Sequence, residues 1–418
     1  MIQNTSGQAR EAGDIALNSG LAHRVAGIRP DELISVLLLR NIPEQSPRSM
    51  ERFADEMARG LEAQPGVCAR ETTIHASRLH GHRLGYRLDR YLSLFIRYPL
   101  HARRQSAQVY HVIDHSYGHL LGCIPANRAV ITCHDLMLLH AEKEDIGFRA
   151  SRLLLRRFRW ETSFLRRAAL VACVSEATAN DAIELLHLDP ARVRVILQGI
   201  SSSFVPTSDE SRAEVRRALD PTGRRALVLQ MSSGGAYKNI PGTLRVIREL
   251  RSRGLDPVLA RVGEPLNAGQ VAEATEMGVL DSVREFGRAS DQELARLYSA
   301  ADVLLFPSKW EGFGAPPLEA LACGTPSVVA SECRSVVDLL GDAALAEPAD
   351  DIRALASAIE MIVTTPALRA TLVERGRSRV QALTWRRTSE AYVVAYEEIA
   401  AAAGRSSARR PTSARSDG

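Results

Sequence analysis

Short apolar runs alternate with longer amphipathic stretches along the chain from Leu33 to about Ser357. Each run has the length of a strand and each stretch that of a helix, a pattern typical of parallel sheets with crossover helices. The first half contains five such runs and the second half another five; they begin at Ile34, Val109, Ala129, Leu170 and Val193, and at Ala226, Pro257, Val283, Asp302 and Ser327. The pattern predicts two Rossmann-like sheets of five strands each, with a ligand cleft between them.

The length of the chain agrees with two domains, because 418 residues exceed what one hydrophobic core usually holds. A polar stretch rich in Ser after Gly199 is the predicted link between them. We expect an N-terminal domain over residues 31–205, joined by a helix at about 387–403, and a C-terminal domain over residues 206–386. Residues 1–30 and the low-complexity tail 404–418 are expected to be disordered.

Composition restricts the classes of function. The longest apolar runs fall far short of the ~18 residues of a membrane span, and the first thirty residues lack the apolar core of a secretory signal, so we expect a cytoplasmic protein. The net charge of +4 is too small for a dedicated nucleic-acid binder. The six cysteines include no C-x-x-C pair and mostly lie in apolar runs, which predicts reduced thiols and no zinc site.

Two carboxylates, Glu311 and Glu319, surround a Gly-rich turn and the double proline of residues 316–317. Proline fits the first turn of a helix, so the segment predicts a loop, a helix of about two turns and a strand from Ser327. The free N–H groups at such a helix start form an anion site at the strand ends. An acid early in a helix is also favoured by the helix dipole alone, so Glu319 by itself could be structural.

Two further turns of the second half could contact a ligand. Gly234 and Gly235, followed by Lys238 and Asn239, fit a loop whose backbone approaches a phosphate and whose lysine reaches it, although any strand-to-helix turn can look like this. After another strand, the pair Gly287-Arg288 could hold a flat ring, and a plain connection is equally compatible with the sequence.

In the first half, His134 and Asp135 directly follow a predicted strand. Histidine beside an acid at a strand end is a plausible hydrogen-bonding group for a polar substrate, and a structural role is as plausible. Three residues after another strand face the same predicted cleft: His115, Ser116 and Tyr117. Ser175 is expected to cap a helix.

The stretch from Phe148 to Arg167 is predicted to be a basic amphipathic helix. Its arginines on one arc of about 100° are Arg149, Arg152, Arg156, Arg159, Arg166 and Arg167. Such a face can dock on anionic lipid, and the alternative is a solvated face in a chain with fifty arginines and three lysines.

Read in order, the segments TCHDL, VACVSEAT, GGAYKN and FGRASDQELARLYSAADVLLFPSKWEGFGAPPLEALACGTPSVVAS resemble the retaining glycosyltransferases of family 4. The resemblance covers roughly residues 33–403. It implies the α/β GT-B fold, in which two Rossmann-like domains with parallel sheets face each other across a cleft and a C-terminal helix crosses back to the first domain.

The resemblance also implies roles for particular residues. Glu319 would bind the ribose hydroxyls of a nucleotide sugar, Glu311 would face the donor sugar, and Lys238 would neutralise the diphosphate. His134 would lie near the sugar hydroxyls. Further donor contacts would come from Gly234, Gly235, Asn239, Gly287, Arg288, Gly312, Phe313, Gly314 and Ala315, and acceptor contacts from Asp135, His115, Ser116 and Tyr117.

The implied reaction is transfer of a hexose from GDP- or UDP-hexose to a glycan or lipid-linked acceptor, with no metal, no cofactor and no nucleic acid. The TCHDL and GDAAL segments favour mannose. Alternatives are a catalytically inactive GT-B scaffold that binds sugars, or a GT-B epimerase or phosphorylase. Lys309 is expected to be structural.

Overall fold

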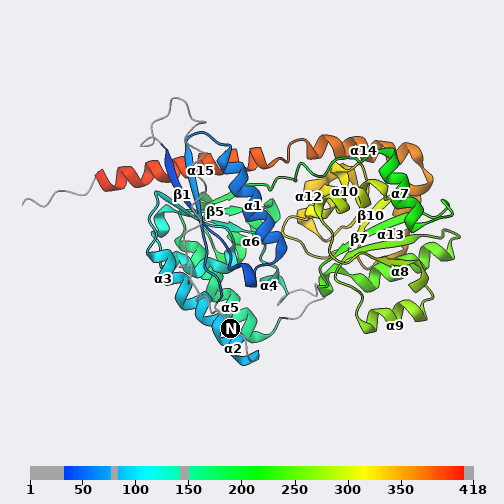
Figure 1. The fold of residues 1–418 in the computed structure, drawn as a ribbon, viewed down its shortest axis with the longest axis horizontal. Coiled ribbons are helices and arrows are strands. Elements are labelled where there is room, and N and C mark those ends of the chain that lie inside the picture. The colour runs from blue at the N-terminus through cyan, green and yellow to red at the C-terminus, as the bar shows by residue number, and fades with distance from the viewer. Residues whose placement is uncertain (1–32, 77–82, 142–149, 409–418) are drawn as a thin grey trace, which may run out of the picture.

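The computed structural model describes residues 33–76, 83–141 and 150–408. Two α/β domains lie side by side, and the last helices run along one side of both (Figure 1). Each domain is built on a six-stranded parallel sheet. The predicted α/β class with two Rossmann-like sheets is therefore confirmed.

The first sheet has the order β2-β1-β3-β4-β5-β6. Its strands are β1 (Ile34–Leu39), β2 (Val67–Thr72), β3 (Val109–Val112), β4 (Ala129–Cys133), β5 (Leu170–Cys173) and β6 (Val193–Val195). Its helices are α1 (Arg48–Glu62), α2 (Arg83–Leu92), the π-helical segment η4 (Ser93–Arg97), α3 (Tyr98–Arg103), η5 (His115–Gly122), α4 (Met137–His140), α5 (Arg152–Ser163), η7 (Phe164–Arg167) and α6 (Glu176–Leu186).

The second sheet has the order β12-β11-β10-β7-β8-β9. Its strands are β7 (Leu227–Ser232), β8 (Val258–Gly263), β9 (Val283–Glu285), β10 (Val303–Phe306), β11 (Ser327–Ala330) and β12 (Ala344–Glu347). Its helices are α7 (Asp209–Leu219), η9 (Ala236–Lys238), α8 (Ile240–Ser252), α9 (Ala268–Glu276), α10 (Asp291–Ala300), α11 (Ala315–Ala322), α12 (Arg334–Leu340), α13 (Ile352–Thr364) and α14 (Pro366–Val380).

All ten predicted strands are present, but the prediction of five strands per sheet was wrong. The two additional strands, β2 and β12, lie at the edges of their sheets. Their sequences, VCARET and ALAE, mix apolar with charged residues because an edge strand is only partly covered. A search for apolar runs passes over such strands.

Both faces of each sheet are covered, which explains the continuous apolar runs. Along β1, Val36 and Leu38 belong to one core cluster, whereas Leu37 and Leu39 belong to another on the opposite face. This alternation follows from the two-residue period of a strand. The second sheet is likewise packed between two clusters.

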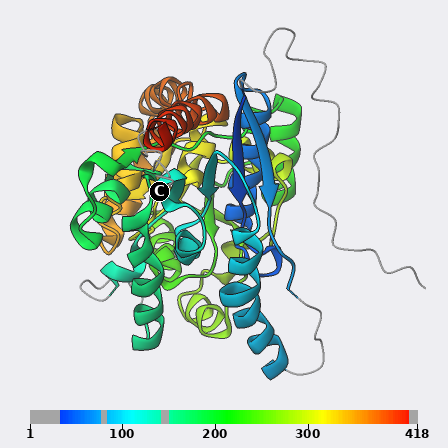
Figure 2. The same cartoon turned by 90° about the vertical axis from the view of Figure 1, so that its left-hand side faces the viewer.

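The last helix, α15 (Trp385–Ala408), packs on the first domain after the chain has completed the second (Figure 2). Tyr396 Oη lies 2.7 Å from His111 Nδ1, and Tyr392 Oη lies 2.7 Å from Thr132 Oγ1, so buried hydrogen bonds tie α15 to β3 and β4. The predicted crossing back of a C-terminal helix is confirmed.

This helix also corrects one expected boundary. It continues to Ala408, so the first five residues of the segment predicted to be disordered, 404–408, belong to this helix. The other segments predicted to be disordered, 1–30 and 409–418, lie outside the described residues.

The predicted basic helix is shorter than expected. The α-helix α5 spans Arg152–Ser163 and is followed by the separate 3₁₀ turn η7. Arg166, in that turn, donates from Nε to the carbonyl of Leu186. Arg149 lies outside the described residues. The five arginines of this set that the structure describes therefore do not form one α-helical face, because the chain changes helix type at Phe164.

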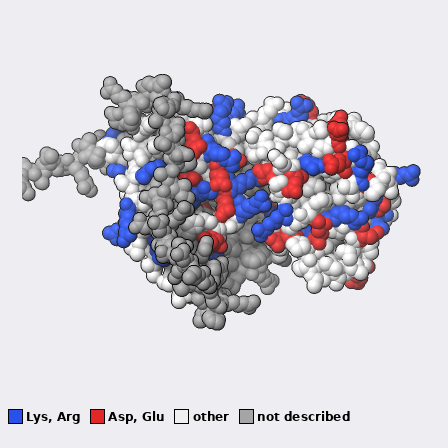
Figure 3. Space-filling view, viewed as in Figure 1, with Lys and Arg blue, Asp and Glu red and all other residues white. Residues whose placement is uncertain are grey.

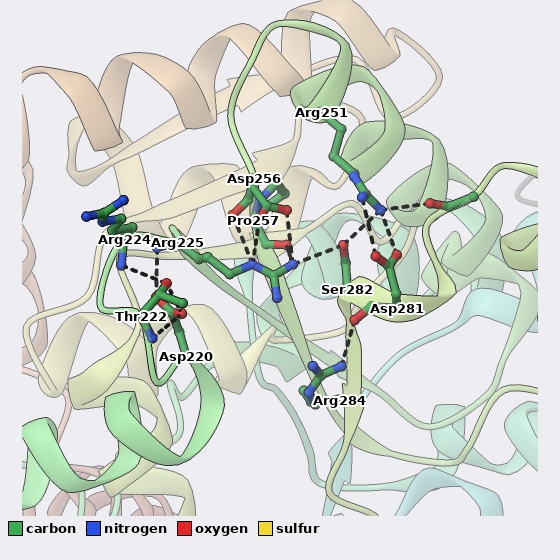
Figure 4. A network of polar contacts seen from close by, with 11 residues as sticks. Asp220, Thr222, Arg224, Arg225, Arg251, Asp256, Pro257, Asp281, Ser282 and Arg284 are labelled. Carbon is green, nitrogen blue, oxygen red and sulfur yellow. Dashed lines mark hydrogen bonds and ion pairs between the residues drawn. The ribbon is translucent and has the colours of Figure 1, made fainter.

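A network of polar contacts links the segments that directly precede β7, β8 and β9, at the amino ends of these strands (Figure 4). Arg225 donates to Asp256, to the carbonyl of Pro257 and to Ser282, while Arg251 pairs with Asp281 at 2.6 Å. These charges stabilise the amino ends of the strands, and in open α/β sheets ligands bind at the opposite, carboxyl ends.

The mixture of charges on the surface (Figure 3) agrees with the small net charge, and the state of the cysteines agrees with the prediction of reduced thiols. Figure 3 shows basic and acidic side chains interspersed over the second domain. All six cysteines are free. In the parts of the chain that the structure describes, no single helix is long and apolar enough to span a membrane; α13 and α14 pass that test only as a pair, and they are bent by 98°.

Candidate active site

The loop between β10 and α11 contains the sequence that links Glu311 to Glu319. Gly314 has a φ of 81°, and a Cβ at this position would lie 2.4 Å from Val336 Cγ2, so glycine is required on both grounds. Pro316 and Pro317 occupy the first turn of α11, as predicted. They have no N–H groups, so Phe313, Gly314 and Ala315 supply the N–H groups at this helix start.

Glu311 lies in that loop and pairs with Lys238. Lys238 Nζ is 2.6 Å from Glu311 Oε1, and both side chains are mostly covered. Burial disfavours the charged ammonium, but the neighbouring carboxylate outweighs it, and the pKa of Lys238 is raised. The pair joins the turn after β7 to the loop after β10, the two turns selected from the sequence.

Glu319 is buried in the second turn of α11 and accepts two hydrogen bonds. Tyr298 Oη donates to Oε2 at 3.0 Å, and Arg52 Nη1 donates to Oε1 at 3.0 Å. Burial raises the pKa of Glu319, while Arg52 opposes that shift. Arg52 belongs to α1 of the first domain, lies 3.5 Å from Asp291 and covers the ring of Phe204. Glu319 is therefore one end of an ion pair between the domains.

The backbone beside Glu311 makes the second contact between the domains. The carbonyl of Gly312 accepts hydrogen bonds from Ser175 Oγ at 2.7 Å and from Thr178 Oγ1 at 3.3 Å. A Cβ at Gly312 would lie 1.8 Å from the carbonyl oxygen of His134, so only glycine fits. Ser175 also caps α6, as predicted. The Glu311 loop thus touches the carboxyl ends of β4 and β5 directly.

His134 is buried directly behind this contact. Its Nε2 lies 2.8 Å from the carbonyl oxygen of Ile113, which can only accept, so Nε2 carries the proton. Its Nδ1 lies 3.3 Å from Gln198 Nε2, and its ring packs edge-on against Phe53. Burial lowers the pKa of His134, which favours the neutral ring. Both ring nitrogens therefore have partners within the protein.

A second polar cluster follows β3. Asp114 accepts from Asn41 Nδ2 at 2.6 Å and from the backbone N–H of Ser116 at 2.8 Å. Burial disfavours its charge, but the nearby histidines and these donors outweigh burial and lower its pKa. His115 Nδ1 lies 3.6 Å from Asp114 Oδ1 and accepts from the backbone N–H of His134. Among the described residues, Asn41 Oδ1 has no hydrogen-bond partner.

The remaining acceptor-side candidates have mainly structural contacts. Tyr117 is buried, and its hydroxyl accepts from the backbone N–H of Ile42. Asp135 accepts from the backbone N–H of Met137 and lies beside Gly312. Ser116 is half-buried after β3. The structure thus brings His115 and Asp135 near the Glu311 loop, while it places Tyr117 within the packing of its own domain.

The donor-side candidates separate in the same way. Gly234, with a φ of 82°, and Gly235 form the turn before Lys238, as predicted. Asn239 caps α8 through Oδ1 and donates from Nδ2 to the carbonyl of Ala349. Both polar atoms of its side chain therefore have partners within the protein. Gly287, with a φ of 57°, and Arg288 lie after β9; Arg288 is exposed, 3.9 Å from Glu264.

Lys309 pairs with Asp350 at 2.7 Å, in agreement with the predicted structural role. Within the residues that the structure covers, no group of three or more His, Cys, Asp or Glu side chains could hold a metal ion. The expectation of metal-independent chemistry stays a prediction.

Sequence reasoning missed Arg52, Tyr298 and Asp114. Arg52 and Glu319 are separated by 267 positions, and no local pattern marks such a contact. Tyr298 lies in an ordinary amphipathic helix, where an aromatic residue predicts core packing. Asp114 directly precedes His115, so an acid beside a histidine after a strand was a usable signal.

Comparisons with known proteins agree with this geometry. Residues 211–379 match the family model described as Glycosyl transferases group 1, and residues 50–204 match Glycosyltransferase Family 4. O-antigen chain mannosyltransferase B of Escherichia coli is 25% identical over 307 residues, which cover 71% of this chain and 78% of the relative. D-inositol 3-phosphate glycosyltransferase of Salinispora arenicola is 31% identical over 270 residues, and the match spans 60% of either protein.

The solved structure of Anabaena Alr3699/HepE in complex with UDP-glucose is similar over 89% of this chain and 99% of that chain, with a TM-score of 0.67 and 16% identity. That similarity shows a shared fold. The two family models match successive halves of the chain, one for each Rossmann-like domain. The chain belongs to the glycosyltransferases of group 1 and family 4, with the GT-B fold.

Proposed function

We propose that this glycosyltransferase moves a hexose, with mannose favoured, from a nucleoside diphosphate sugar to a glycan or lipid-linked acceptor in the cytoplasm, with retention of the anomeric configuration. One observation carries the proposal: Glu311 and Glu319 flank the start of α11 between the two sheets, each paired with a cation. A nucleotide sugar offers an anionic diphosphate and neutral hydroxyls, which suit such an arrangement.

The diphosphate would lie at the start of α11. The N–H groups of Phe313 to Ala315 and the ammonium of Lys238 are fixed donors, and a helix start favours anions. Donors held in place before reaction stabilise the charge that develops on a leaving group by several kcal/mol. Binding would replace part of the Glu311–Lys238 pair by a contact between Lys238 and phosphate.

The ribose would be held by Glu319. Each of its oxygens has one protein donor, and a carboxylate oxygen accepts two hydrogen bonds, so a ribose hydroxyl can be added while Arg52 and Tyr298 stay bound. Glu311 would face the sugar. On the side of the first domain, the proposed sugar site would be bordered by His134, whose ring is neutral, and by Asn41, whose Oδ1 has no hydrogen-bond partner among the described residues.

The proposed chemistry needs no protein nucleophile. The bond between the anomeric carbon and the diphosphate oxygen breaks, the acceptor oxygen bonds to the same face of that carbon, and the acceptor proton passes to the leaving phosphate oxygen. Glu311 would stabilise the positive character of the sugar in this step. Contact between the domains would exclude water and limit hydrolysis.

The names of the relatives support the choice of substrate. O-antigen chain mannosyltransferase B of Escherichia coli is a mannosyltransferase by name, which favours mannose, and the structure of Anabaena Alr3699/HepE holds UDP-glucose, which supports a nucleotide sugar donor. The intact ion pairs of Glu311 and Glu319 argue against an inactive scaffold, because a scaffold would not need both.

A panel of GDP, UDP and ADP in a thermal-shift assay tests the donor class. A ligand that binds only the folded protein adds about 2.7 kcal/mol of stability at a hundred times its Kd. We expect GDP or UDP to raise the unfolding temperature. If none of the three nucleotides does so at millimolar concentration, the proposed donor is wrong.

A further inference from the structure

An exposed apolar stripe runs along the segment formed by α2, η4 and α3. Its members are spaced every four residues and are 60, 40, 51 and 52% exposed: Leu88, Leu92, Ile96 and Leu100. None of these side chains is needed for the core of the first domain. Large exposed apolar patches are uncommon on proteins with no partner.

The π-helical segment η4 keeps this stripe straight. In an α-helix of 3.6 residues per turn, side chains four apart drift around the axis by about 40° at each step. A π turn is wider, because its hydrogen bonds span five residues. The segment Ser93–Arg97 therefore offsets the drift between Leu92 and Leu100 and keeps the stripe on one side.

Helix α5 continues the same surface. The ring of Trp160 lies 5.7 Å from that of Phe95, and the guanidinium of Arg157 covers the rings of Tyr91 and Phe95. Leu153, Leu154 and Trp160 of α5 are exposed. Figure 1 shows α2 and α5 next to each other at one end of the first domain.

Arginine dominates the charge of these segments. Residues 83–104 and 150–167 contain twelve arginines and only two acids, Asp89 and Glu161. Both acids are buried, and they pair with Arg97 at 3.7 Å and with Arg157 at 2.8 Å. An apolar surface with aromatic residues and arginines around it is complementary to an anionic bilayer, into which the apolar side chains can insert.

We propose that the docking surface formed by α2, η4, α3 and α5 binds the surface of an anionic lipid bilayer. It differs from the basic helix expected from the sequence, because the apolar stripe on α2–α3 supplies most of the inserted area. The helices α2 and α5 come after the carboxyl ends of β2 and β4, on the side of the domain where the acceptor is expected. Docking would therefore hold that side near a membrane.

Vesicle flotation with the full chain tests this surface. The vesicles are phosphatidylcholine alone, or phosphatidylcholine with about 30% phosphatidylglycerol. The apolar variant replaces Leu92, Ile96 and Leu100 by Ser, and the charge variant replaces Arg90, Arg103 and Arg104 by Ser. The matched control carries Val271→Ser, Leu280→Ser and Met361→Ser, at exposed positions of the second domain. Circular dichroism and the unfolding temperature establish that each variant is folded.

We expect the wild type and the control to float with anionic vesicles only, and binding to fall at high salt. The apolar and charge variants should each lose at least about tenfold in binding. The proposal is overturned if the wild type does not float, if it binds neutral vesicles equally well, or if folded apolar variants bind like the wild type. A wild-type dimer that the apolar variant converts to monomer, with no flotation, would overturn it in favour of self-association. The assay measures lipid binding alone, so its result is independent of the proposed sugar transfer.

Discussion

Glu311 and Lys238 neutralise each other at a distance of 2.6 Å in a mostly buried site. Such a pair is expensive to break on one side, because the remaining charge stays buried without a partner. The Glu311 carboxylate is thus placed to face a sugar that gains positive character, and the Lys238 ammonium to meet a phosphate. Glu311 pairs with Lys238, and Glu319 pairs with Arg52, which also lies 3.5 Å from Asp291.

We predict that Glu311→Gln lowers kcat for sugar transfer by about a hundredfold, because the amide keeps the shape but lacks the charge that is needed in the transition state. KM for the donor should change much less. Steady-state kinetics with the donor found in the nucleotide panel measures both quantities. Glu390→Gln, on the exposed side of α15, is the control and should behave like the wild type. Unchanged kcat in Glu311→Gln would show that the role of Glu311 is wrong.

The loop from β10 to α11 contacts the first domain through its backbone. Its carbonyl at Gly312 accepts from the N-terminal turn of α6, and its backbone touches the end of β4. Because the contact with the end of β4 is made by backbone atoms on both sides, no side chain can move aside to accept a larger residue at position 312. Closure of the two domains therefore depends on the absence of a side chain at one position.

We predict that Gly312→Ala separates the two domains locally and lowers kcat at least tenfold, because the added Cβ would lie 1.8 Å from the carbonyl oxygen of His134. Nucleotide binding to the second domain should change little. Gly269→Ala, in α9, is the matched control, since its Cβ would meet only Asn267 Oδ1 at 3.4 Å. Full activity of Gly312→Ala would contradict the closed contact.

Helix α15 is held by a buried histidine whose protonation is linked to stability. His111 is fully buried between Thr132 and Tyr396, and burial, with a smaller effect of His134, lowers its pKa to about 3. Burial likewise lowers the pKa of His119 to about 4. An unfolded histidine binds a proton below about pH 6.5, whereas these folded histidines do not. The stability that comes from keeping these two histidines neutral is therefore fully present above pH 6.5. It is lost as the pH falls from 6.5 toward 4.

We predict that the free energy of unfolding of the first domain falls by up to about 1.4 kcal/mol per pH unit for each of these histidines below pH 6.5. Scanning calorimetry between pH 7 and pH 5 follows that transition. His111→Gln should be less stable at pH 7 but should lose less stability on acidification. An equal loss in the variant and the wild type would exclude His111 as a cause.

At the scale of the whole molecule, the apolar pattern predicted ten of the twelve strands, including every strand with four or more buried residues, and the double proline predicted α11. The edge strands β2 and β12 were missed because half-exposed strands carry charged residues. The donor contact of Asn239 stays a prediction; the structure shows its side chain capping α8, which an Asn directly before a helix start with Pro241 typically indicates.

The ion pair of Arg52 with Glu319 could not be predicted, because it depends on how two domains meet. Local pattern describes single elements, and only the arrangement of the domains brings α1 next to α11. The partners of His134 lie within its own domain, Ile113 directly after β3 and Gln198 after β6, and only the packing of that domain brings them together. The sequence could therefore predict the acids of the site, but not which groups hold them.

Calorimetric titration of the nucleoside diphosphate that gives the largest thermal shift tests the central claim, that the Glu319 end of α11 holds the donor nucleotide. We predict that Glu319→Ala weakens binding at least tenfold, through loss of hydrogen bonds to the ribose, and that Glu319→Gln has a smaller effect. The exposed control Glu276→Ala in α9 should bind like the wild type. Equal affinity of wild type and folded Glu319→Ala would contradict the claim.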